Sequence, residues 1–169
     1  MRVAPELIAG LCRARARDVF TPVHWQGSPV DSAKLLWALS GVESTFGLNS
    51  NPRHEQGYCV GGRYFDSTLT EQWGCLAHCS YGPWQVMFSN FPRGVSPISL
   101  LIQGDGTVAA DLCIRGAIAV INRAIARGAQ NLGDIVIAYN GPGNEKEYSA
   151  RLAESYDRPM PQYQDPVTA

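Results

Sequence analysis

Glu43 is the residue of this chain whose surroundings best suit acid–base chemistry. It directly precedes Ser44 and follows an apolar stripe with helical spacing, formed by Leu35, Leu36, Leu39 and Val42. Burial beside apolar side chains raises the pKa of a carboxyl group, because it disfavours the charged form. An acid that keeps its proton near neutral pH can protonate a leaving oxygen, which contributes about 10²- to 10⁴-fold in rate. We therefore predict Glu43 as a general acid; the alternative is an ordinary exposed Glu at a helix end.

Two further segments combine turns with polar side chains. Residues 80–87 read SYGPWQVM, and residues 135–143 read IVIAYNGPG. The Gly-Pro pair in each segment is typical of a sharp turn. Such turns leave Gln85, Tyr139 and Asn140 where their side chains can face a cleft, so these three are candidate binding residues.

In chain order, the pieces Glu-Ser, Gly-x-x-Gln and Ala-Tyr-Asn-x-Gly-Pro-Gly span Glu43 to Gly143. This ordered set resembles the lysozyme-like soluble lytic transglycosylases, peptidoglycan-cleaving domains akin to goose-type lysozymes. The resemblance implies that Glu43 is the single catalytic acid and base. The positions that it implies for substrate binding are Ser44, Gln85, Tyr139 and Asn140. Trp84 lies with Pro83 where the family usually has Leu-Met; we predict a cleft aromatic there, with burial as the alternative.

The resemblance also implies a reaction. The bond between N-acetylmuramic acid and N-acetylglucosamine would be cleaved to a 1,6-anhydro product, without metal or cofactor. A hydrolysing muramidase is the main alternative, and it needs a second carboxylate. The stretch after Glu43 is unusually long for the family and offers Glu55, Asp66 and Glu71. A glycan-binding or virion structural module without turnover is the third hypothesis.

Composition narrows the class of protein. The chain has 169 residues, 45% hydrophobic and 17% charged, with a net charge of −1. This favours one folded domain and excludes a disordered chain or a nucleic-acid binder that relies on charge. No secretory signal or membrane-spanning segment is evident. We expect a monomer that binds peptidoglycan glycan strands in the periplasm or cell wall, as a phage endolysin or virion component.

The elements that must position these residues are mostly helices. The predicted fold is α+β and mainly α, a lysozyme-like helical bundle with a small inserted hairpin or irregular lobe at about residues 49–79. Hydrophobic periodicity and capping signals predict helices at Pro5 to about Phe20, Asp31 or Ser32 to Glu43, Thr107 to Gly128, Asn131 to Tyr139 and Asn144 to about Ser155. We expect a loop at residues 21–30 and a loose tail at about 159–169.

Three of the five cysteines fall in the predicted lobe. His54 and His78 lie nearby in the sequence. The set of His54, Cys59, Cys75 and Cys79 offers ligands of the kinds that a structural zinc ion uses. A disulfide between Cys59 and either Cys75 or Cys79 is an alternative, and free thiols are another. Cys12 and Cys113 lie on apolar helix faces and are predicted to be buried core thiols.

Overall fold

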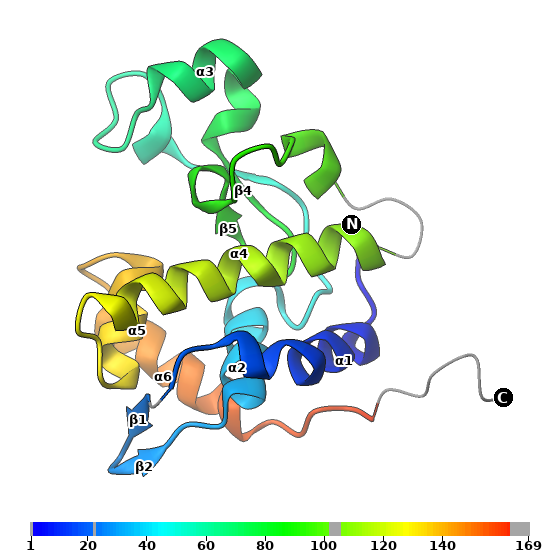
Figure 1. The fold of residues 1–169 in the computed structure, drawn as a ribbon, viewed down its shortest axis with the longest axis vertical. Helices are drawn as coiled ribbons and strands as arrows, with labels where there is room; N and C mark the ends of the chain where they lie inside the picture. Colours follow the sequence, from blue (N-terminus) through cyan, green and yellow to red (C-terminus); the bar gives the residue numbers. More distant parts are fainter. Residues whose placement is uncertain (1, 22, 102–105, 163–169) are drawn as a thin grey trace, which may run out of the picture.

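The computed structural model describes residues 2–21, 23–101 and 106–162. It has an α+β fold that is mainly helical, as predicted: a helical body carries a small lobe, residues 49–79, on one side (Figure 1). The helices of the body are α1 (Pro5–Arg15), α2 (Ser32–Ser44), α4 (Thr107–Ala126), α5 (Leu132–Asn140) and α6 (Glu145–Asp157).

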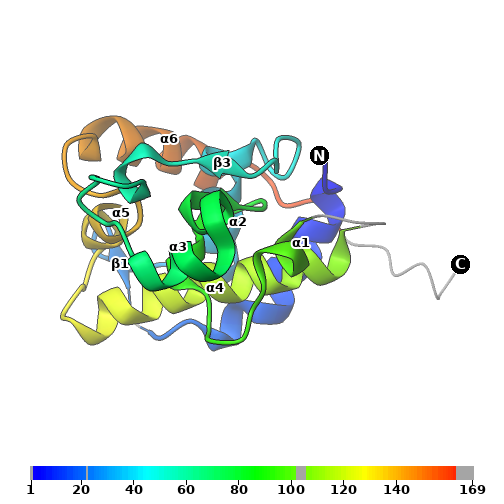
Figure 2. The same cartoon turned by 90° about the horizontal axis from the view of Figure 1, so that it is seen from above.

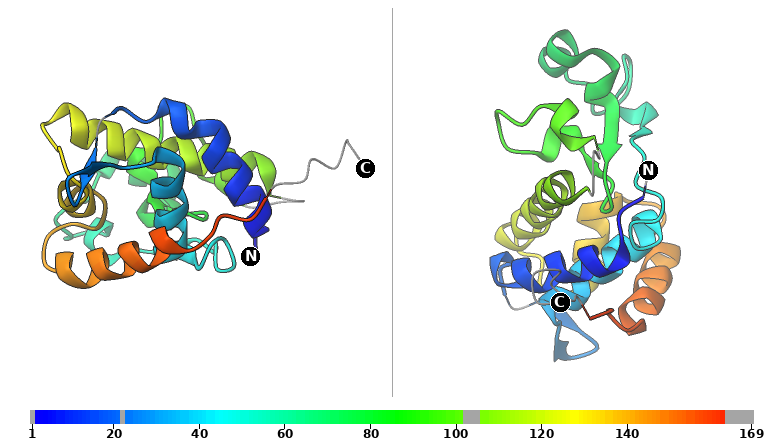
Figure 3. Two further views of the ribbon diagram at one scale, coloured as in Figure 1. Left: turned by 90° about the horizontal axis from the view of Figure 1, so that it is seen from below. Right: turned by 90° about the vertical axis from the view of Figure 1, so that its right-hand side faces the viewer.

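Helix α2 is at the centre of the body. Asp31 caps it, since its side chain accepts a hydrogen bond from the Lys34 N–H at 3.0 Å. The predicted apolar stripe is buried, with Leu35, Leu36 and Leu39 at most 1% exposed. Helices α1 and α6 pack on either side of α2 (Figure 3). The end of α2 is therefore held rigidly inside the body.

Helix α4 runs across the molecule between the lobe and α1 (Figure 1). Its small residues let neighbours approach closely on several sides; Ala110, Cys113 and Ala117 are completely buried. The predicted helix from Thr107 is confirmed, although it ends at Ala126 and not at Gly128. The prediction of buried thiols is also confirmed, for Cys113 and for Cys12 on α1, and burial raises the pKa of both.

Two sequence predictions in the first thirty residues need correction. Helix α1 ends at Arg15 and is followed by a 3₁₀ turn, Ala16–Asp18, so the prediction of a helix to Phe20 was too long. The predicted loop at 21–30 contains a hairpin of β1 (His24–Trp25) and β2 (Ser28–Pro29). Gln26 and Gly27 between the strands both have positive φ, as a two-residue hairpin turn requires.

The lobe lies on the side of the molecule opposite to this hairpin (Figures 1 and 2). It contains β3 (Arg53–His54), α3 (Ser67–Trp73) and the start of β4 (Cys79–Tyr81). Strand β4 pairs antiparallel with β3 and with β5 (Val86–Met87). None of residues 51–76, all of which the structure describes, is buried. The lobe therefore lacks an apolar core of its own.

After α6 the chain has no regular structure through Gln162. This agrees with the start of the predicted tail, whereas its remainder, 163–169, lies outside the described residues.

Candidate active site

Glu43 is placed by the end of α2. The helix stops at Ser44, and Thr45 and Phe46 both adopt left-handed backbone conformations. The Ser44 hydroxyl donates to the Ser40 carbonyl at 3.0 Å and accepts from the Gly47 N–H at 2.9 Å. Ser44 is 2% exposed and is not among the residues lining the cavity described next. Its role here is to stabilise the turn, and the structure does not place it where a substrate could bind.

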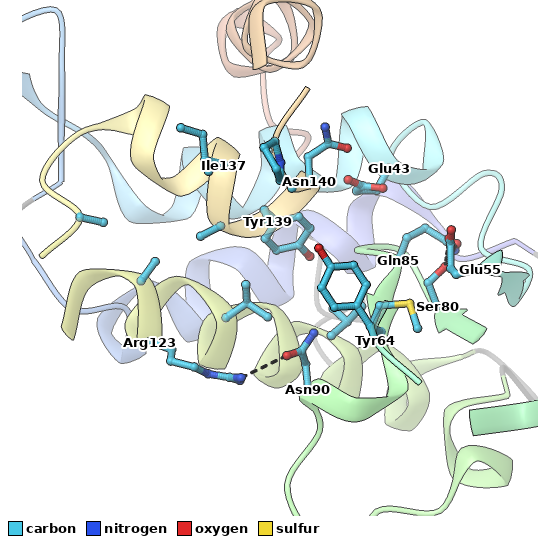
Figure 4. Close-up of a pocket in the computed structure, with 18 of the residues that line it drawn as sticks. Glu43, Glu55, Tyr64, Ser80, Gln85, Asn90, Arg123, Ile137, Tyr139 and Asn140 are labelled. Atoms are coloured by element: carbon cyan, nitrogen blue, oxygen red, sulfur yellow. Dashed lines mark hydrogen bonds between the residues drawn. The ribbon is translucent and has the colours of Figure 1, made fainter. Parts of the chain in front are cut away.

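A cavity of about 910 Å³ separates the helical body from the lobe (Figure 4). Glu43 lines it from α2, Tyr139 and Asn140 line it from α5, and Glu55 and Tyr64 line it from the lobe. Residues far apart in the sequence thus meet at one concave surface, the usual form of a small-molecule or glycan site.

The Glu43 carboxyl group is largely withdrawn from solvent, with its side chain 10% exposed. The Tyr148 hydroxyl donates to Glu43 Oε1 at 2.6 Å, and Arg53 Nη2 lies 3.6 Å from Glu43 Oε2. Burial raises the pKa of Glu43, and this effect exceeds the opposing effects of the Tyr148 hydrogen bond and of the charges on Arg53 and Arg151. Glu43, at the wall of the cavity, therefore keeps its proton to a higher pH than an exposed carboxyl group.

Sequence reasoning missed the partners of Glu43. Tyr148 comes from α6, where Tyr148, Leu152 and Ser155 form the buried face. That spacing could have predicted a core position for Tyr148 but not its contact with Glu43, 105 residues earlier. Arg151, on the same helix, donates to the Val42 carbonyl at 2.6 Å and so fastens α6 to the end of α2.

Gln85 lines the cavity, but its side chain is already engaged. Its amide N–H groups donate to the carbonyls of Asn51 at 3.1 Å and Gly82 at 2.8 Å, and its oxygen accepts from the Ser80 hydroxyl at 2.9 Å. Gln85 also has a positive φ, which these contacts hold in place. The side chain thus ties the lobe to the β4–β5 turn, and its predicted contact with substrate stays a prediction.

Tyr139 and Asn140 are presented by the last turn of α5, which ends where Gly141 takes a positive φ. The Tyr139 hydroxyl donates to the Trp84 carbonyl at 2.7 Å, and burial raises its pKa. Both residues line the cavity, as the sequence motif suggested.

The prediction that Trp84 faces the cleft is wrong. Its side chain is 0% exposed, and its indole N–H donates to the Leu36 carbonyl at 2.7 Å. The ring fills space against α2, so it stabilises the body that carries Glu43 and offers no surface to a sugar.

Of the three candidates for a second carboxylate, only Glu55 lines the cavity. Its Oε1 accepts from Arg53 Nε at 2.8 Å. The Ser80 hydroxyl lies 3.0 Å from the same oxygen, but its single proton is shared with Gln85 Oε1 at 2.9 Å. Arg53 contacts both Glu43 and Glu55 and so links the two acids. Asp66 instead caps α3 by accepting from the Leu69 N–H at 3.0 Å, and Glu71 is an exposed residue of α3 that is not part of the cavity wall.

The lobe also contributes aromatic surface that sequence reasoning did not single out. The rings of Tyr58 and Tyr64 lie 5.2 Å apart between centroids, and both line the cavity. Tyr64 is 49% exposed. Across the cavity, Arg123 of α4 donates to the Asn90 side chain at 3.2 Å (Figure 4). Aromatic faces and polar groups of this kind suit a polar ligand with apolar ring faces, such as a sugar.

The lobe contains one candidate metal-binding group among the described residues. Ligand atoms of His54, Cys59 and His78 all lie within 4.8 Å of one another. The predicted set is therefore corrected: His78 belongs to the group, whereas Cys75 and Cys79 do not. All five cysteines, which fall within the described residues, are free, so the alternative of a Cys59 disulfide is not formed.

Within the described residues, no helix is both long enough and apolar enough to span a membrane. Comparisons of this chain with protein-family models, with curated proteins and with solved structures found no match.

Proposed function

We propose that the protein is a peptidoglycan lytic transglycosylase that cleaves the β-1,4 bond between N-acetylmuramic acid and N-acetylglucosamine. The observation that carries the proposal is the Glu43 carboxyl group, largely buried at the wall of the cavity with a raised pKa. The ordered sequence motifs supply the substrate class. A protonated carboxyl group at the edge of a cavity is what protonation of a glycosidic oxygen requires.

In the proposed reaction Glu43 acts twice. It first donates its proton to the oxygen that leaves, and the Tyr148 hydroxyl and the Arg53 guanidinium stabilise the carboxylate that forms. The carboxylate then accepts the proton of the muramoyl 6-hydroxyl as that oxygen attacks the anomeric carbon. The product is a 1,6-anhydro sugar, and Glu43 regains its proton. The first step breaks the glycosidic C–O bond and the second forms the C–O bond between O6 and the anomeric carbon, and Glu43 transfers the proton in each.

Substrate binding is proposed to use both walls of the cavity. The exposed face of Tyr64 can pack against a sugar ring, and the Asn140 amide can bond to hydroxyl or acetamido groups. The lobe and α5 form two walls of the cavity, so a glycan strand would lie between them and pass Glu43.

Hydrolysis is the second candidate, because Glu55 faces the same cavity. Its ion pair with Arg53 engages Oε1, and Oε2 is the atom that would accept a proton from an attacking water. On this alternative Glu43 remains the acid and Glu55 is the base.

The test is mass spectrometry of fragments released from purified peptidoglycan by the wild type and by Glu55→Gln. For a transglycosylase we expect fragments lighter by one water than reducing muropeptides, with the product unchanged in the variant. Reducing ends that disappear in Glu55→Gln would instead establish hydrolysis. Glu71→Gln is the matched control, since this acid lies in the lobe but away from the cavity.

The same purified peptidoglycan distinguishes a non-catalytic module from an enzyme. If no fragments form although the protein sediments with peptidoglycan, the enzyme proposal fails and a glycan-binding or virion structural role takes its place.

A further inference from the structure

We propose that His54, Cys59 and His78 bind a zinc ion that stabilises the lobe. The three residues come from separate parts of it: His54 from β3, Cys59 from the end of a 3₁₀ turn at Gln56–Tyr58, and His78 from the residue before β4. A metal ion bound to all three would connect the two ends of the lobe. This site is distinct from the acid pair in the cavity and does not rest on the proposed function.

The spacing of the ligand atoms fits a tetrahedral zinc site. Zinc binds histidine nitrogen at about 2.0–2.1 Å and thiolate sulfur at about 2.3 Å, so two such ligands lie about 3.6 Å apart at a tetrahedral angle. The distance from His54 Nε2 to Cys59 Sγ is 3.5 Å. All three ligand atoms fall within 4.8 Å of one another, so small side-chain rotations bring them to bonding distance of one ion.

Hydrogen bonds around His78 leave one ring nitrogen available. Thr70 Oγ1 donates its proton to the Asp66 carbonyl at 2.7 Å, so toward His78 Nε2, at 3.0 Å, it can only accept. Nε2 therefore carries the hydrogen, and the lone pair lies on Nδ1. Metal-binding histidines usually donate their second N–H to such an acceptor, which fixes the ring. His78 is 8% exposed, so its contact with Thr70 is shielded from solvent, whereas none of residues 51–76 of the lobe is buried.

The fourth position of the tetrahedron can be filled in two ways. Cys79 lies directly opposite His54 in the β3–β4 pair, so its side chain leaves the sheet on the same face. Its Sγ at present faces the Cys75 carbonyl at 3.6 Å. A rotamer change could bring it to the ion, and a water molecule completes the site otherwise.

The lobe has a physical need for such an ion. None of residues 51–76, all within the described chain, is buried, so the lobe gains little from the hydrophobic effect. Small units without a core are commonly held by disulfides or a structural metal, and the cysteines here are free. His54 is adjacent in sequence to Arg53 and Glu55, so an ion at His54 would also hold these two residues in the cavity wall.

The experiment uses the purified chain under reducing conditions. Metal analysis should find about one zinc per chain, and replacement by Co²⁺ should give the visible bands of a tetrahedral ion and a near-ultraviolet thiolate-to-cobalt band. Zinc affinity is then measured by competition with a chromophoric chelator. Cys59→Ser and His78→Ala should lower it by more than about 100-fold, and Thr70→Val, which removes the acceptor for His78, by about 10-fold.

Cys75→Ser is the matched control, because this exposed lobe thiol is outside the group and its loss should leave the zinc affinity unchanged. Equal losses in Cys75→Ser and Cys59→Ser would overturn the assignment. A wild-type cobalt spectrum without a thiolate band would also overturn it, and this readout does not depend on any variant folding. No peptidoglycan is used, so a failure of the enzyme proposal leaves this result unaffected.

Discussion

The helical body and the lobe hold their acids in opposite ways. Glu43 is buried at the end of a packed helix and receives a hydrogen bond from Tyr148. Glu55 projects from a lobe without a buried core, with its side chain 32% exposed, and is held by its ion pair with Arg53. In the body, packing controls the protonation of an acid; in the lobe, charge and hydrogen bonds control its position. Two identical residue types are thereby suited to different roles.

The strongest test of this comparison is Glu43→Gln. The amide keeps the size of the side chain and can still accept the Tyr148 hydrogen bond, but it cannot donate a proton as an acid. We expect the rate of glycan cleavage to fall by about 10²- to 10⁴-fold. Turnover is measured by release of soluble muropeptides, and sedimentation with peptidoglycan should be retained. Unchanged turnover would remove Glu43 from the mechanism.

Tyr148→Phe tests how the body sets the pKa of Glu43. The Tyr148 hydrogen bond lowers this pKa, so its loss should raise it further. Because the acid must be protonated, the decline of activity at high pH should move upward in the variant. A downward movement in the pH–rate profile would contradict the assigned hydrogen bond.

Trp84→Phe tests whether the body contributes a sugar-binding aromatic. The change removes the N–H that donates to the Leu36 carbonyl and leaves space in the core. We expect the free energy of unfolding to fall by about 1–3 kcal/mol in urea titration, with KM for peptidoglycan fragments nearly unchanged. A large increase in KM without loss of stability would show that the ring binds substrate.

The pH dependence of the free energy of unfolding tests whether burial raises the pKa of Glu43. Its folded-state pKa is raised, so between the ordinary and the raised pKa the unfolded chain loses its proton first. Stability contributed by the protonated group is therefore lost as the pH rises through this interval. We expect the wild type to lose about 1.4 kcal/mol relative to Glu43→Gln for each pH unit of the interval. Parallel stability curves for the two proteins would mean that the pKa is not raised.

Tyr64→Ala tests whether the lobe contributes a sugar-binding aromatic, as Trp84→Phe does for the body. The ring is exposed and faces the cavity, so its removal should weaken glycan binding by about 2- to 12-fold, the range that corresponds to 0.5–1.5 kcal/mol of aromatic contact. The melting temperature should hardly change. Together with Trp84→Phe, this variant would assign stability to the body and glycan contact to the lobe; a loss of stability without an effect on binding would reverse that assignment.

Local signals in the sequence predicted much of the body. The Asp31 cap and the stripe of Leu35, Leu36 and Leu39 depend on residues a few positions apart, so helix α2 and the edge position of Glu43 could be predicted. The partners of Glu43 could not, because Tyr148 reaches it from another helix through tertiary packing.

The lobe was predicted less well, since its contacts depend on strand pairing. Asp66 precedes Ser67–Trp73 as an N-cap, a local signal that could have separated it from Glu55. His78 joined the metal group because β3 and β4 pair, which spacing between cysteines does not show. Trp84 was assigned to the cleft because it lies in a motif, yet membership in a motif does not determine which way a side chain points.

Arg53 gives the cavity wall a property that neither acid has alone. With Glu43 protonated and Glu55 ion-paired to Arg53, the three side chains carry no net charge. In the proposed reaction, the same trio becomes an anion when Glu43 gives up its proton, as the sugar ring develops positive charge. These three side chains would therefore supply a counter-charge during bond cleavage and lose it again on reprotonation.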